Sequence, residues 1–226
     1  NNGDGTALLV ADAGVRWPTL LHELAPQGWG GLEFGVGIPG TLGGGVISNA
    51  GAHNGELGQA LAWIEVLDAR KSGSKDGDDL HLPQIRRYQH DELDLGYRHS
   101  RFREQRRSRF SAQGRLIPAP RALIEPAEIV LLLGVHLHRA DPAKLHSTLG
   151  QHLLYRERTQ PRQQHIGLIF KNPPEDYASR LIDLAGMEGY TIGNAQISTL
   201  DPNFIINLGG AQAADVAALV EETHHR

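Results

Sequence analysis

Residues 31–58 read GLEFGVGIPGTLGGGVISNAGAHNGELG, and ten of the 27 glycines of the chain fall within them. The run from Gly35 to Gly40 matches the G-x-G-x-x-G pattern of dinucleotide-binding loops. The match is weak because that pattern opens a helix, whereas Pro39 removes one amide donor and three more glycines follow. Successive amides without side chains can still approach a diphosphate closely and hold an anion. A tight structural loop explains the same composition equally well.

The composition excludes several classes of protein. The chain has 226 residues, with 22 Lys+Arg against 26 Asp+Glu and a net charge of −4, which argues against a nucleic-acid binder. Cysteine is absent, so disulfides, thiolate metal sites and cysteine nucleophiles are excluded. No stretch reaches the roughly 20 apolar residues that span a bilayer, so we expect no membrane partner. The only methionine is Met187, and we therefore expect this chain to be part of a longer one.

Hydrophobic periodicity and turn residues predict short strands and helices in irregular order. Strands are expected at Ala7–Ala11, Ala62–Leu67, Ala127–His138, Ile166–Phe170 and Asn203–Leu208, and helices at Trp17–Leu24, Pro142–Arg158, Tyr177–Ala185 and Ala211–Glu222. Asp141 before Pro142 is typical of a helix N-cap, and Pro18 suits the first turn of its helix. Elements that do not alternate regularly favour an α+β fold.

The Pro- and Gln-rich segment Thr159–Gln164 marks the expected domain boundary. It predicts one domain over residues 1–158 and a second over residues 159–226. Within the first domain, Lys71–Asp79 is predicted to form a polar turn.

Several motifs occur in a definite order along the chain. They are Gly37-Ile38-Pro39-Gly40-Thr41-Leu42-Gly43-Gly44, Asn49-Ala50-Gly51-Ala52, Gly96-Tyr97-Arg98-His99-Ser100-Arg101-Phe102, Phe170-Lys171-Asn172-Pro173, Leu181-Ile182-Asp183-Leu184-Ala185-Gly186 and Asn203-Phe204-Ile205-Ile206-Asn207. In this order and spacing they resemble the UDP-N-acetylenolpyruvoylglucosamine reductases of peptidoglycan synthesis, the MurB family. The resemblance covers nearly the whole chain, and several ordered motifs are far more specific than any single one.

The resemblance implies an α+β fold with an FAD-binding domain of the vanillyl-alcohol-oxidase/PCMH type and a smaller α+β substrate-binding domain of the MurB C-terminal type. It implies an FAD-dependent reductase that converts UDP-N-acetylenolpyruvoylglucosamine to UDP-N-acetylmuramate, with NADPH as the hydride source. Hydride transfer to the enol ether leaves carbanion character on the neighbouring carbon, so the reaction needs a stabilising cation and a proton donor. We further expect a cytoplasmic monomer with a small-molecule UDP-sugar as its partner and no nucleic acid.

The resemblance also implies roles for individual residues. Arg98 matches the catalytic arginine of the family, and a guanidinium can hold a carboxylate through two hydrogen bonds. Tyr97, Lys171 and Asn172 match substrate-binding positions. The FAD-binding positions are Gly37, Ile38, Pro39, Gly40, Thr41, Gly43, Gly44, Asn49, Gly51 and Ala52. The plain alternatives are a solvated basic face around Arg98 and a loop at Lys171 and Asn172 that only positions the next residue, a proline.

The sequence departs from the family pattern in three places. Leu168 stands where the family has a proton-donating serine or cysteine, and leucine has no proton to give. The family's terminal glutamate and its first FAD-binding domain are also expected to be missing from this chain. These departures leave an alternative open, a catalytically impaired homologue that binds flavin and UDP-sugar.

Asp201 is expected to be a turn residue, and the twelve histidines have no metal-ligand spacing, so we expect no metal site.

Overall fold

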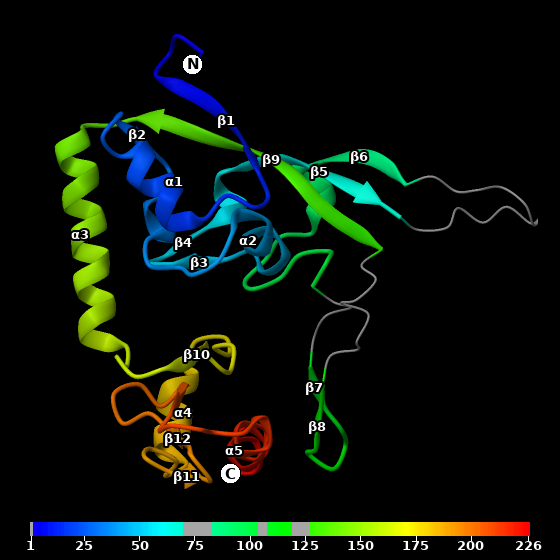
Figure 1. Ribbon diagram of the computed structural model, residues 1–226, viewed down its shortest axis with the longest axis vertical. Coiled ribbons are helices and arrows are strands. Elements are labelled where there is room, and N and C mark those ends of the chain that lie inside the picture. Colours follow the sequence, from blue (N-terminus) through cyan, green and yellow to red (C-terminus); the bar gives the residue numbers. More distant parts are fainter. Residues whose placement is uncertain (1, 70–82, 104–107, 119–126) are drawn as a thin grey trace, which may run out of the picture. The chain divides into compact units, whose positions relative to one another are not determined.

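The computed structural model describes residues 2–69, 83–103, 108–118 and 127–226 of the chain (Figure 1). The described residues form two compact units. The first unit contains the described part of residues 2–103 together with residues 127–153, and the second contains residues 108–118 and 154–226. The chain passes between them within helix α3 (Pro142–Thr159), and the domain ranges 1–158 and 159–226 stay a prediction. The polar turn predicted at Lys71–Asp79 lies outside the described residues.

An antiparallel sheet is the centre of the first unit, with strand order β1-β9-β5-β6 and β2 paired to the end of β9. Its strands are β1 (Thr6–Asp12), β2 (Trp29–Gly30), β5 (Leu61–Asp68), β6 (Gln84–Gln89) and β9 (Glu128–Arg139). Side chains alternate between the two faces of a strand. In β5, Ile64 and Val66 are therefore fully buried, and Trp63, Glu65 and Leu67 share the opposite face as predicted.

Helices α1 (Trp17–Leu24) and α2 (Leu42–Ser48) join the inner face of this sheet in one hydrophobic core. Trp17 is fully buried and meets Phe34 edge-on, with ring centroids 5.7 Å apart. Burying a large apolar side chain of this kind contributes about 1.5–3 kcal/mol relative to leaving it exposed. The remaining elements among the described residues of this unit are β3 (Gly51–Ala52), β4 (Gly55–Glu56) and three 3₁₀ turns at Glu33–Gly35, Leu57–Gln59 and His90–Leu93.

The second unit has its own antiparallel sheet, in the order β10-β13-β12-β11, and its own core. Its elements are β7 (Arg109–Phe110), β8 (Leu116–Ile117), β10 (His165–Leu168), α4 (Ala178–Leu184), β11 (Thr191–Ile192), β12 (Ala195–Ile197), β13 (Phe204–Asn207) and α5 (Ala213–His225). The β7–β8 hairpin packs on α5, where the Phe110 ring stacks on His224 at 3.7 Å. The Leu116 amide also donates a 2.8 Å hydrogen bond to Glu221.

The predicted strands and helices are present, with ends that differ by a few residues, and the α+β class is confirmed. Asp141 caps α3 as expected, since its carboxylate accepts the Ala143 N–H at 2.9 Å. Helix α2, strand β6 and the short pairs β3–β4, β7–β8 and β11–β12 were not predicted. The poor match to the dinucleotide-binding pattern implied that no helix forms through Gly43–Gly45, and this expectation is wrong, because α2 runs through all three glycines.

Candidate functional site

Helix α2 starts inside the glycine-rich stretch. Gly37 and Gly40 have φ angles of 74° and 100°, which other residues rarely adopt, and they turn the chain into the helix. Thr41 is the N-cap, and its hydroxyl accepts a hydrogen bond from the Gly44 amide at 3.4 Å. These residues, with Ile38, Pro39 and Gly43, belong to the predicted FAD-binding set. The structure therefore places most of that set in a loop and the first turn of one helix.

A hollow of about 330 Å³ lies beside this turn. Thr41, Gly43 and Gly44 line it together with residues from β9 and from the turn that follows β1. A Cβ at Gly44 would meet nothing nearer than the Thr41 hydroxyl, at 3.7 Å, so the space in front of this backbone is open. Bare backbone beside an open hollow fits the close approach of a diphosphate.

Glu128 is the acidic residue that lines the hollow, and two neighbours offset its charge. The Tyr88 hydroxyl donates a 2.6 Å hydrogen bond to Glu128, and the Arg101 guanidinium lies 3.7 Å from the same carboxylate oxygen. Arg101 also stacks over the Tyr88 ring at 4.0 Å. The carboxylate therefore has a hydrogen-bond donor and a cation beside it, which limits its repulsion of an anion in the hollow.

Asn49 ends α2 in the left-handed conformation, with φ of 43°. Its side chain is fully buried. The side-chain oxygen accepts the Gly58 amide at 2.7 Å, and the side-chain nitrogen donates to the Gly96 carbonyl at 3.0 Å. Gly51 and Ala52 follow in β3, which pairs with β4. The predicted FAD-binding role of Asn49 stays a prediction, and within the protein its side chain joins three segments.

Tyr97 and Arg98 form the tip of a tight turn, closed by two hydrogen bonds between Gly96 and His99 at 3.2 and 2.9 Å. Arg98 has φ of 52°, which is unusual for a residue with a side chain. Its guanidinium donates a short hydrogen bond to the carbonyl of Gly51. The candidate catalytic residue is thereby in direct contact with the predicted FAD-binding segment.

The other predicted substrate-binding residues lie in the second unit. The Asn172 side chain accepts the Ala178 amide at 3.1 Å, at the start of α4. Lys171 lines a hollow of about 420 Å³ together with Phe170 and Ile182. Leu168 is 53% exposed at the end of β10. The structure thus brings Arg98 to the glycine segment in one unit and keeps Lys171 and Asn172 on one loop in the other.

Asn203 organises that loop, although the motif that contains it predicted no role for its side chain. Its side-chain oxygen accepts the amides of Ile169 and Phe170 at 3.2 and 2.9 Å, and its nitrogen donates to the Phe170 carbonyl at 2.9 Å. Asp201 accepts the Asn203 amide at 3.0 Å, which agrees with a turn residue. Partial burial raises the pKa of Asp201 above the ordinary aspartate value.

Two domain families match the chain. Residues 3–72 match the FAD binding domain, and residues 160–226 match the C-terminal domain of UDP-N-acetylenolpyruvoylglucosamine reductase. The UDP-N-acetylenolpyruvoylglucosamine reductase of Heliobacterium modesticaldum (strain ATCC 51547 / Ice1) is 34% identical over 99% of this chain and 70% of that protein. The chain belongs to the MurB family.

Other relatives agree with this assignment. The corresponding reductase of Synechococcus sp. (strain RCC307) is 39% identical over 95% of this MurB chain. The crystal structure of UDP-N-acetylenolpyruvylglucosamine reductase (MurB) from Thermus caldophilus matches with a TM-score of 0.75 and 32% identity, over 96% of this chain and 68% of that one. This MurB chain spans 61%, 62% and 60% of the lengths of three curated relatives. The predicted family and its two-part fold are therefore confirmed.

Among the described residues, no group of three or more His, Asp or Glu side chains is placed to hold a metal ion. No helix in the same ranges is both long and apolar enough to cross a membrane.

Proposed function

We propose that this MurB chain is an FAD-dependent reductase that converts UDP-N-acetylenolpyruvoylglucosamine to UDP-N-acetylmuramate with NADPH, in peptidoglycan synthesis. The observation that carries the proposal is the hydrogen bond from the Arg98 guanidinium to the Gly51 carbonyl. It places a permanent cation in contact with the segment that would hold the flavin. We assign FAD binding to residues 1–158 and substrate binding to residues 159–226.

The FAD-binding set divides by position in this proposal. Gly37, Ile38, Pro39, Gly40, Thr41, Gly43 and Gly44 supply the loop and the first turn of α2, beside the 330 Å³ hollow. Asn49, Gly51 and Ala52 supply the chain that leaves the same helix. When bound, FAD supplies the hydride that it has received from NADPH.

Arg98 would act on the substrate carboxylate. Negative charge develops on that group when hydride reaches the neighbouring double bond, and a planar guanidinium can hold it through two hydrogen bonds. We assign substrate contacts to Tyr97, Lys171 and Asn172, of which Lys171 adds a cation suited to a diphosphate. Leu168 cannot donate a proton, so we propose solvent water as the proton source at this position.

The test is flavin binding and turnover by the purified protein. We expect visible flavin absorbance after purification with FAD, and NADPH oxidation that depends on the enolpyruvyl UDP-sugar. Arg98→Lys keeps the charge but loses the two-pronged geometry, so it should slow substrate reduction by about 10²–10³-fold while NADPH still reduces the flavin. Protein that binds no flavin, or that oxidises NADPH equally with and without the UDP-sugar, would contradict the proposal.

A further inference from the structure

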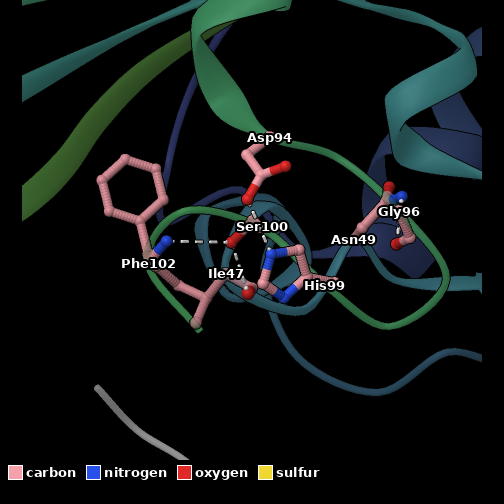
Figure 2. Close-up of polar contacts among 7 residues, drawn as sticks. All are labelled: Ile47, Asn49, Asp94, Gly96, His99, Ser100 and Phe102. Carbon is pink, nitrogen blue, oxygen red and sulfur yellow. Dashed lines mark hydrogen bonds and ion pairs between the residues drawn. The ribbon is translucent and has the colours of Figure 1, made fainter. Parts of the chain in front are cut away.

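Three hydrogen bonds join the Arg98 turn to the end of α2 and the residues that follow it. Their partners in that segment are every second residue, Ile47, Asn49 and Gly51. The Ser100 hydroxyl donates to the Ile47 carbonyl at 2.7 Å. The Asn49 side chain donates to the Gly96 carbonyl at 3.0 Å, and the Arg98 guanidinium donates to the Gly51 carbonyl. Figure 2 shows the first two of these contacts around the turn. The turn is thus held two residues before and two residues after Arg98.

The two side chains that hold the turn lie inside the protein, so in the proposed function Asn49 would meet FAD through its backbone. Ser100 and Asn49 are both fully buried. Their polar atoms are used inside the protein, because the Ser100 hydroxyl also accepts the Phe102 amide at 3.3 Å and the Asn49 oxygen accepts the Gly58 amide. A buried polar group left without a partner costs about 1–3 kcal/mol, so these contacts are not readily exchanged for others.

The backbone of Arg98 gives a reason for this support. A residue with a side chain at a φ of 52° is strained, and such strain persists only where the surrounding contacts fix the conformation. Around the turn, His99 Nε2 also lies 2.9 Å from Asp94 Oδ2 (Figure 2). The Arg101 amide donates to the Leu93 carbonyl at 2.9 Å. The anchors at Ser100 and Asn49 link this strained turn to the segment that precedes Gly51.

We propose that Ser100 and Asn49 are positioning residues of the reductase reaction, which hold the Arg98 turn in register with the FAD-binding segment. The inference rests on the proposed function, because it concerns where Arg98 acts. Arg98 and the bare backbone of Gly51 then move as one body, and the guanidinium needs no reorganisation when charge develops on the substrate. A displacement of about 1 Å at a reacting group can cost as much as 100-fold in rate.

The first experiment needs no ligand and no turnover. Amide hydrogen exchange is measured in the wild type, in Ser100→Ala and in Ser48→Ala, a matched control whose hydroxyl bonds within α2 to the Gly44 carbonyl at 3.3 Å. We expect faster exchange at His99 and Arg101 in Ser100→Ala only, with α1 unchanged. If Ser100→Ala does not fold, Ser100→Cys replaces it, because the cysteine side chain has a similar shape and its S–H group is a weaker hydrogen-bond donor. Its amide exchange is then compared with that of the wild type and of Ser48→Ala. Unchanged exchange at His99 and Arg101 overturns the proposal.

The second experiment is a double-mutant cycle in the flavin-loaded protein. Ser100→Ala should slow substrate reduction by up to roughly 100-fold and leave flavin reduction by NADPH unchanged. In an Arg98→Lys background the same change should have little further effect, because the residue acts through Arg98. The positioning role is overturned if the rate losses of Ser100→Ala and Arg98→Lys multiply in the double mutant. It is also overturned if Ser100→Ala slows flavin reduction and substrate reduction equally. A wild type that shows no UDP-sugar-dependent NADPH oxidation overturns the proposed function instead, and the exchange result stands apart from it.

Discussion

Gly43 lies so close to Ala13 that a Cβ at position 43 would stand 2.7 Å from the Ala13 Cβ and 3.1 Å from its carbonyl oxygen. The two backbones are also joined, since the Gly43 amide donates to the Ala13 carbonyl at 2.9 Å. At the next residue, Gly44, an added Cβ would meet only the Thr41 hydroxyl, at 3.7 Å. The two adjacent glycines of the predicted FAD-binding set therefore differ: close packing on Ala13 leaves no room for a side chain at Gly43, whereas the space beside Gly44 is open.

Gly43→Ala should destabilise the first unit. The added methyl group would contact the backbone of Ala13, which cannot move aside as the tip of a flexible side chain could. Overpacking of this kind typically costs about 1–3 kcal/mol in the free energy of unfolding, and urea denaturation measures it. A variant as stable as the wild type would show that α2 can move away from Ala13.

Gly44→Ala should separate stability from cofactor binding. Position 44 is exposed within α2, where alanine is favoured over glycine, so the free energy of unfolding should rise by up to about 1 kcal/mol. The same methyl group would occupy part of the 330 Å³ hollow, so FAD should bind more weakly in a fluorescence titration. Unchanged FAD affinity would place the diphosphate away from Gly44.

The fold was predictable where its determinants are local. The alternation of Val135 and Leu137 with two histidines shows one buried face of β9, and Asp141 marks the start of α3 within a few residues. Helix α2 could not be predicted in this way, since each glycine disfavours a helix by about 1 kcal/mol. It forms because Gly43 and Gly45 pack on Ala13 and Trp17, which are far away in the sequence. Strand β6 was missed because only Tyr88 of its six residues is buried.

The sequence motifs predicted which segments form the candidate site, but they did not predict the hydrogen bonds between those segments. Motif order located Arg98 and the glycine segment, and it gave no sign that Ser100 would bond to Ile47, 53 positions earlier. It also gave no sign that both polar atoms of the Asn49 side chain would bond within the protein, to Gly96 and Gly58. Contacts of this kind depend on tertiary packing that no local pattern encodes.

Asp201 should make the stability of the protein depend on pH. Burial raises its pKa in the native state, so the native state binds the proton more tightly than the unfolded chain does. The free energy of unfolding should therefore fall as pH rises from the ordinary aspartate pKa of about 3.9 through the raised native value. Asp201→Asn has no such charge and can still accept the Asn203 amide.

The expected result is an advantage of Asp201→Asn over the wild type at neutral pH that disappears in acid. Urea denaturation of both proteins from about pH 3 to pH 7 measures this difference. Asp4→Asn is a comparison at a carboxyl group with the opposite behaviour, because hydrogen bonds from Thr6 lower the pKa of Asp4. A difference between Asp201→Asn and wild type that does not change with pH would contradict the prediction.

Leu168→Ser should accelerate the second half of the proposed reaction. Leu168 is 53% exposed, so the change should alter the free energy of unfolding by no more than about 0.5 kcal/mol. A serine at this position supplies the hydroxyl proton that leucine lacks, and a positioned proton donor typically contributes about 10²–10⁴-fold. We therefore expect faster substrate reduction in single-turnover measurements, with flavin reduction by NADPH unchanged. Ile166→Ser, a change of similar chemistry at a 64% exposed position of the same strand, is the control and should leave both steps as they are. An equal rate in Leu168→Ser and wild type would mean that the proton reaches the substrate by a route that does not involve position 168.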